Sequence, residues 1–130
     1  MTYTAQAGRS RYAADTVSTA SPARLLIMLY DRLVLDLVTA ESAASTGDVT
    51  TMSRQLVHAQ DIVLELRTSL DLTLWDGAQG LSDLYTYLYG ELVTANVKKD
   101  AARIAACRSL FEPLRDAWRT AALQMAQQSA

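Results

Sequence analysis

Apolar side chains recur at alternating steps of three and four residues along most of this chain, which is the spacing of one face of an α-helix. No stretch alternates apolar and polar positions as a strand would over more than a few residues. The pattern predicts four helices, over residues 21–45, 48–70, 81–97 and 100–125. The clearest apolar series lies in the second of these segments: Val49, Met52, Leu56, Ala59, Val63, Leu66 and Leu70.

Start and stop signals agree with these segments. Ser21 is a good N-cap, and Pro22 suits the first helical position, where a backbone N–H is not needed. Gly47 is a plausible residue just past the end of the first helix, and Asp48 can cap the second. Pro113 interrupts the fourth segment, but the apolar series continues on both sides of it, which predicts one kinked helix rather than two.

Four amphipathic segments in 130 residues predict a single all-α domain, an antiparallel up-down four-helix bundle with an N-terminal arm. We expect residues 1–20 to form the arm or a lid, residues 21–126 to form the bundle, and residues 127–130 to form a flexible tail. The segment DLTLWDGAQG at 71–80 is expected to be a loop.

The first helix carries more apolar side chains than one core face needs. Residues 25–30 are all apolar, and at about 100° per residue they surround the helix axis. The obvious core face is Leu26, Leu29, Leu33, Leu37 and Ala40, widened by Ile27, Tyr30 and Val34. Leu25, Met28 and Leu35 project on the other side among Arg24, Asp31, Arg32 and Asp36. A contiguous apolar set among charges indicates a surface for a partner.

The arm supplies three sizeable apolar groups of its own, Tyr3, Tyr12 and Val17, which precede this surplus surface. It can cover the surface as a removable lid, or it can be anchored there permanently by Tyr12. The third helix adds an apolar edge. The residues expected to bind a partner, or the lid in its place, are Tyr12, Val17, Leu25, Met28, Leu35, Tyr85, Tyr89 and Val93.

Charge and composition limit the classes of protein to which this chain can belong. The net charge is −2 and the charges are mixed, so the chain lacks the basic patch typical of nucleic-acid binders. No apolar run approaches the roughly 20 residues that span a bilayer, and no signal peptide is visible. A single cysteine cannot build a disulfide framework. We therefore expect a cytoplasmic protein that contacts neither nucleic acid nor the membrane interior.

The residues needed for catalysis or metal binding are few. His58 is the only histidine, so neither a di-iron bundle nor a Cys/His zinc site can be assembled. Cys107 occupies an apolar position, where cysteine behaves as a small hydrophobe. Small helical enzymes of the chorismate mutase type use inward arginines, but the arginines here fall off the apolar faces or at helix ends. We expect no cofactor, no metal and no enzymatic activity.

Several stretches resemble the FliS family of flagellar secretion chaperones. They are YAADTVSTASP at 12–22, LLIMLYD at 25–31, GD at 47–48, HAQDIVLELRTSLD at 58–71, LYTYL at 84–88 and ANVKKD at 95–100. The resemblance covers roughly residues 12–118 in order. The chain departs from the family pattern at Asp15, where Asn is usual, and at Ala23, where Glu is usual.

The resemblance implies a cytoplasmic chaperone without nucleotide or catalysis. Its client would be flagellin, through the C-terminal segment that is disordered in the monomer, and it would prevent premature polymerisation and support delivery to the type III export apparatus. An export-gate component is a further candidate partner, and a homodimer is left open. The alternatives are a non-catalytic helical adaptor that oligomerises through the same surface and, less favoured, a small helical enzyme.

Overall fold

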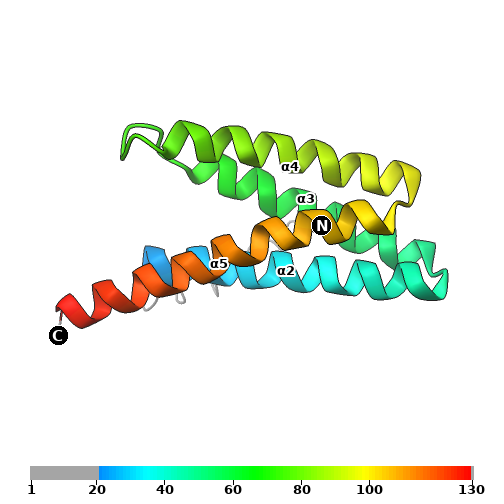
Figure 1. Ribbon diagram of the computed structural model, residues 1–130, viewed down its shortest axis with the longest axis horizontal. Helices are drawn as coiled ribbons and strands as arrows, with labels where there is room; N and C mark the ends of the chain where they lie inside the picture. Colours follow the sequence, from blue (N-terminus) through cyan, green and yellow to red (C-terminus); the bar gives the residue numbers. More distant parts are fainter. Residues whose placement is uncertain (1–20, 130) are drawn as a thin grey trace, which may run out of the picture.

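The computed structural model describes residues 21–129 and shows an all-α bundle in that range, without strands. Its four helices are α2 (Pro22–Thr46), α3 (Val49–Ser69), α4 (Ala78–Lys98) and α5 (Ala101–Ser129). Successive helices run antiparallel, and α2 packs against both α3 and α5 (Figure 1). The four-helix bundle predicted from the periodicity is confirmed.

The bundle is closed at one end and open at the other. Figure 1 shows the α3/α4 pair converging on the α2/α5 pair where the α2–α3 and α4–α5 turns lie, and diverging toward the α3–α4 loop. The contact between α4 and α5 is smaller than those that α3 makes with α2 and α4 and that α5 makes with α2. The open end therefore joins the start of α2, the end of α3, the start of α4 and the second half of α5.

Side chains and turns at the helix ends explain the bounds. The Ser21 hydroxyl accepts a hydrogen bond of 3.1 Å from the backbone N–H of Arg24, and the Asp48 carboxylate accepts one of 3.1 Å from that of Thr51. Gly47 has a φ of +75°, a left-handed conformation that glycine adopts without the Cβ penalty of other residues. The predicted caps are thus confirmed at Ser21 and Asp48, and the predicted stop at Gly47.

Two ends differ from the predicted ones. Helix α4 begins at Ala78 rather than Leu81, so Gly80 lies within its first turn. Helix α5 continues to Ser129, beyond the predicted end near residue 125, and residues 127–129 are helical where we expected a tail. No glycine or proline follows Pro113 to stop the helix, and Pro113 itself lies inside α5, as the continuing apolar series predicted.

The core is built from the predicted apolar faces. Its largest fully buried apolar side chains come from all four helices: Tyr30, Leu33, Leu37, Met52, Leu56, Val63, Tyr85, Leu88, Leu92, Ile104 and Phe111. Val49, the first member of the apolar series in the second segment, is exposed instead, at 54%. It is the first residue of α3 and so lies at the edge of the bundle.

The burial of Asp36 corrects a prediction made from the sequence pattern. It was assigned to the charged outer side of the first helix, but its side chain is fully buried. The carboxylate accepts a hydrogen bond of 3.1 Å from Arg32 Nε and also contacts Nδ1 of His58 on α3. A buried carboxylate is tolerated when it is paired in this way. His58 is half-exposed, and its contact with Asp36 joins α3 to α2.

Leu66 tests the assignment of the core face. It is 3% exposed, and truncating a buried leucine to alanine costs about 2–5 kcal/mol. We expect Leu66→Ala to lower the melting temperature by about 10 °C in a thermal scan. Gln127→Ala, at an exposed position near the end of α5, should leave it unchanged, and equal shifts for the two variants would contradict the assignment.

Candidate functional site

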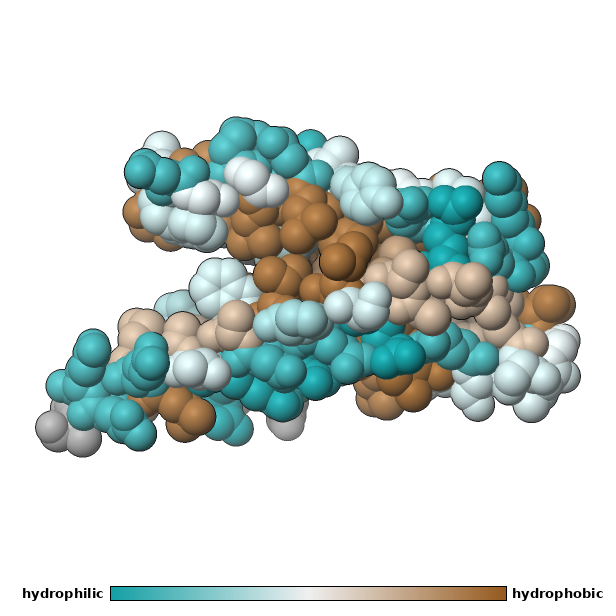
Figure 2. All heavy atoms as spheres, viewed as in Figure 1, coloured by the Kyte–Doolittle hydropathy of each residue, from teal (hydrophilic) through white to brown (hydrophobic). Residues whose placement is uncertain are grey.

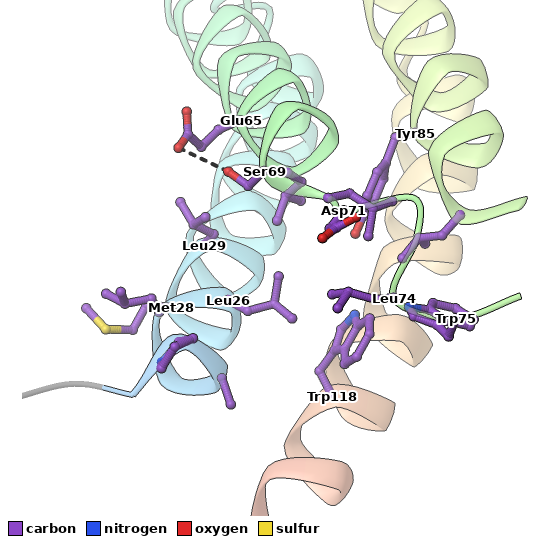
Figure 3. A pocket seen from close by; sticks show the side chains of 16 residues that line it. Leu26, Met28, Leu29, Glu65, Ser69, Asp71, Leu74, Trp75, Tyr85 and Trp118 are labelled. Carbon is purple, nitrogen blue, oxygen red and sulfur yellow. Dashed lines mark hydrogen bonds between the residues drawn. The ribbon is translucent and has the colours of Figure 1, made fainter. Parts of the chain in front are cut away.

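An apolar cavity of about 910 Å³ fills the open end of the bundle. Figure 2 shows apolar side chains gathered in the hollow between the α3/α4 pair and α5, and Figure 3 shows the lining from close by. The lining is mostly apolar and comes from every helix and from the α3–α4 loop. Its residues are Pro22, Ala23, Leu25, Leu26, Met28, Leu29, Glu65, Leu66, Ser69, Leu70, Asp71, Leu74, Trp75, Leu81, Tyr85 and Trp118.

The first two turns of α2 form one wall of this cavity. Leu26 and Leu29 pack against the core with part of their surface, whereas Met28 is 46% exposed. Because residues 25–29 surround the helix axis, α2 can face the core and still present apolar atoms to the cavity. The surplus apolar surface predicted on the first helix therefore exists, and this cavity accounts for part of it.

The α3–α4 loop forms the opposite wall. Asp71 accepts hydrogen bonds from the backbone N–H of Thr73 at 2.9 Å and from its hydroxyl at 2.6 Å, which lowers the pKa of Asp71. This turn carries Leu74 and Trp75 to the cavity (Figure 3). A Cβ at Gly77 would overlap the Trp75 ring, so glycine at this position lets the indole lie against the backbone.

Two tyrosines and a tryptophan lie deep in the cavity region. The hydroxyls of Tyr30 on α2 and Tyr85 on α4 are 2.5 Å apart, and burial raises the pKa of both. Tyr30 also meets Phe111 edge to face, with ring centroids 6.4 Å apart. The indole nitrogen of Trp118 is buried without a well-aligned partner among the described residues, and its nearness to Tyr30 opposes the rise in that pKa. Both tyrosines thus stay neutral, so their pair joins α2 to α4 without adding a charge.

The structure brings some of the predicted partner-binding residues together and not others. Leu25, Met28 and Tyr85 line the cavity, although Tyr85 is only 1% exposed and contributes to its buried side. Leu35 is 51% exposed on α2 but lies outside the cavity. Tyr89 and Val93 are partly buried on α4 and also lie outside it, and Tyr12 and Val17 fall outside the described residues.

Most of the lining was not among the predicted partner-binding residues, and the largest exposed side chains missed come from the loop and from α5. Leu74 and Trp75 are 71% and 47% exposed, and large apolar side chains in a loop were the available signal. Trp118 was placed on the core face of α5. Its position, near the end of that face where the helices diverge, puts the ring between the core and the cavity.

Neither the cavity nor its surroundings offers a metal or an anion site. Across residues 21–129, no group of three or more His, Cys, Asp or Glu side chains is close enough to hold a metal ion. No arginine or lysine lines the cavity in this range, so the arginine clamp of a helical mutase is not assembled there. Within the same residues, no helix is both long and apolar enough to cross a bilayer.

Cys107 should be unreactive in the folded protein. It is 2% exposed, and burial together with the charge of Glu91 raises the pKa of its thiol to about 11. Because the thiolate is the nucleophile, we expect a thiol reagent at pH 8 to modify the native chain about a hundredfold more slowly than the unfolded chain. The rate should rise as the pH approaches 11. Equal rates in native and denaturing buffer would contradict this burial.

The fold and the site define a class: a four-helix bundle with an apolar cavity at its open end. The family model described as "Flagellar protein FliS" matches residues 4–125, and the chain belongs to this family. A flagellar secretion chaperone FliS of Bacillus subtilis is 31% identical over 110 residues, which are 85% of this chain and 82% of the relative. One of Salmonella typhimurium is 33% identical over 107 residues, 81% of this chain and 79% of the relative.

A solved structure has the same fold. It is described as "Crystal structure of flagellar chaperone from bacteria", and it superimposes with a TM-score of 0.74 over 92% of this chain and 98% of its own. Its sequence identity is 22%, so this likeness supports the arrangement of the helices alone.

Proposed function

We propose that this protein is a cytoplasmic export chaperone that binds the disordered C-terminal segment of flagellin in apolar grooves. Binding prevents premature polymerisation and supports delivery of flagellin to the type III export apparatus. The observation that carries the proposal is the apolar cavity of about 910 Å³ at the open end of a bundle that belongs to the FliS family. Membership of a chaperone family also favours binding over catalysis.

The size of the cavity requires an occupant. Protein interiors are close-packed, and voids larger than a water molecule are few in a domain. Nearly all of this lining is carbon, so water inside the cavity would find few hydrogen-bond partners. A segment that brings apolar side chains would replace that water and complete the core between α3, α4 and α5.

A disordered client suits this geometry because it can adopt the shape of the groove. Ordering such a segment costs about 2–5 kcal/mol or more of the interaction energy, so the contact must be large. Further exposed apolar side chains lie beyond the cavity, including Leu35 and Val38 on α2 and Leu64 on α3. A segment that continues from the cavity onto this surface would bury enough area to offset the ordering cost.

Release requires no chemical step in this scheme. Withdrawal of flagellin by the export machinery removes the segment by mass action. An export-gate component is the second partner that we propose. It would bind the complex of chaperone and flagellin rather than the free chaperone.

The test is a comparison of two clients. We expect calorimetry to show saturable binding of purified flagellin and none of flagellin that lacks its C-terminal segment. Light scattering by flagellin under polymerising conditions should fall when the chaperone is added at equal concentration. If both flagellins fail to bind while the chaperone elutes as a defined oligomer, the adaptor alternative replaces this proposal.

A further inference from the structure

The charged residues that line the cavity are acids in the described part of the chain. They are Glu65 on α3 and Asp71 in the α3–α4 loop, and no described lysine or arginine accompanies them in the lining. The surrounding sequence has the same bias, because residues 59–90 contain five acids and one base. The wall built from α3, the loop and α4 is therefore negative, whereas the cavity surface itself is apolar.

Glu65 has no cationic partner among residues 21–129. Its carboxylate accepts one long hydrogen bond of 3.5 Å from the Ser69 hydroxyl, drawn in Figure 3, and forms no ion pair with a described residue. The hydrogen bonds from Thr73 lower the pKa of Asp71, so this acid keeps its charge at neutral pH. Both carboxylates belong to residues that line an apolar site.

The arginines on the facing wall do not meet these carboxylates. Arg119 donates a hydrogen bond of 2.6 Å to Asp31 on α2, and Arg115 lies 3.9 Å from the same carboxylate. These pairs join α5 to α2. The negative wall of the cavity thus remains without a cationic counterpart among the described residues.

We infer that the segment which occupies this cavity carries a lysine or arginine beside its apolar anchors, and that this cation meets Glu65 and Asp71. The inference rests on the proposed function and adds a charge requirement for the client segment. The methylene stem of such a side chain can lie along Met28 and Leu29 while its head reaches Glu65. Complementary charge of this kind raises the association rate and excludes acidic segments from the groove.

The experiment measures the dissociation constant of the flagellin C-terminal segment by calorimetry, with the full chaperone chain. Glu65 is exposed, so Glu65→Gln and Glu65→Lys should fold as the parent does. An exposed ion pair contributes a modest energy, so we expect Glu65→Gln to bind about two- to fivefold more weakly. Glu65→Lys should bind about tenfold more weakly or worse, and the salt dependence of binding should fall in both variants.

Asp83 provides the matched control. It is exposed on α4, opposite the face that carries Leu81 and Tyr85, and it bonds only to Gln79 of its own helix among the described residues. Asp83→Asn and Asp83→Lys make the same charge changes outside the cavity. Binding of these variants should stay within twofold of the parent, and if they weaken binding as much as the Glu65 variants, the inference fails.

A charge swap identifies the cation on the client. Each lysine or arginine of the segment is replaced by glutamate in turn, and we expect one replacement to restore the binding that Glu65→Lys has lost. No restoration by any of them would overturn the inference even though the parent chaperone binds. Absence of binding by the parent chaperone itself would instead overturn the proposed function, so the two failures are distinguishable.

Discussion

Replacing both Leu25 and Met28 by glutamine is expected to weaken binding of the flagellin C-terminal segment about 30- to 150-fold. Both side chains line the cavity from the first two turns of α2, and Met28 is 46% exposed in the free protein. Their loss removes two apolar anchors, together about 2–3 kcal/mol of binding free energy. Glutamine is a good helix former, so far-UV circular dichroism should be unchanged. Calorimetry measures the binding.

The matched control changes two exposed valines outside the cavity. Val49 on α3 and Val97 on α4 are 54% and 78% exposed at the closed end of the bundle, and neither lines the cavity. We expect Val49→Gln with Val97→Gln to alter the dissociation constant less than threefold. A loss equal to that of the cavity pair would show that the cavity is not the anchor of the client.

The sequence alone predicts the fold because local signals and burial agree. The steps of three and four residues in α3 place Met52, Leu56 and Val63 on one line, and all three are buried in the structure. The caps at Ser21 and Asp48 satisfy backbone groups that a helix start leaves unpaired. Such signals depend only on nearby residues, which is why a single sequence reveals them.

The cavity is only partly predictable because it depends on the angle between helix pairs. Periodicity identifies the core face of α5, but it cannot indicate that the helices diverge before Trp118. The position of the loop cannot be predicted from periodicity either. Trp75 is placed by the turn at Asp71 and by the absence of a side chain at Gly77. Met28 could be predicted, because its exposure follows from too many apolar neighbours on one helix.

The burial of polar side chains is also difficult to predict from the sequence. Asp36 reads as a surface charge because it follows Arg32 by one helical turn, an ordinary pattern for exposed pairs. Its burial arises from α3, which brings His58 against it. Tyr85 likewise reads as a side chain on an exposed edge, but α2 supplies the Tyr30 hydroxyl that lets it be buried. Both outcomes depend on contacts between helices that the spacing within one helix does not contain.

Helix α2 begins at the edge of the cavity. Pro22 and Ala23, the first two residues of α2, belong to the lining. Residues 1–20 lie outside the described part, and Tyr12 and Val17 are their main apolar groups after residue 4. We propose that this arm covers the cavity in the free protein as a lid and leaves when flagellin binds. A short tether makes closure inexpensive, because each doubling of loop length costs only about 0.6 kcal/mol.

Hydrogen exchange distinguishes a lid from a permanent anchor. In the lid scheme, protection of amides in residues 5–18 falls on addition of the flagellin C-terminal segment, while protection of residues 22–30 rises. An anchor that belongs to the fold would keep its protection in both states. Unchanged protection of residues 5–18 alongside measurable binding would therefore rule out displacement of the arm.

Deleting residues 1–18 should leave binding of the flagellin segment intact or tighten it. A lid that covers the cavity nine-tenths of the time lowers the apparent affinity about tenfold, and its removal restores that factor. The truncated chain retains Ser21, so the cap of α2 is preserved. It also leaves the apolar cavity uncovered, and an exposed apolar patch favours association. We therefore expect light scattering of the truncated chaperone to rise with concentration and to fall on addition of the segment. Weaker binding of a truncated chain that keeps its helical spectrum would contradict the lid and support Tyr12 as a permanent anchor.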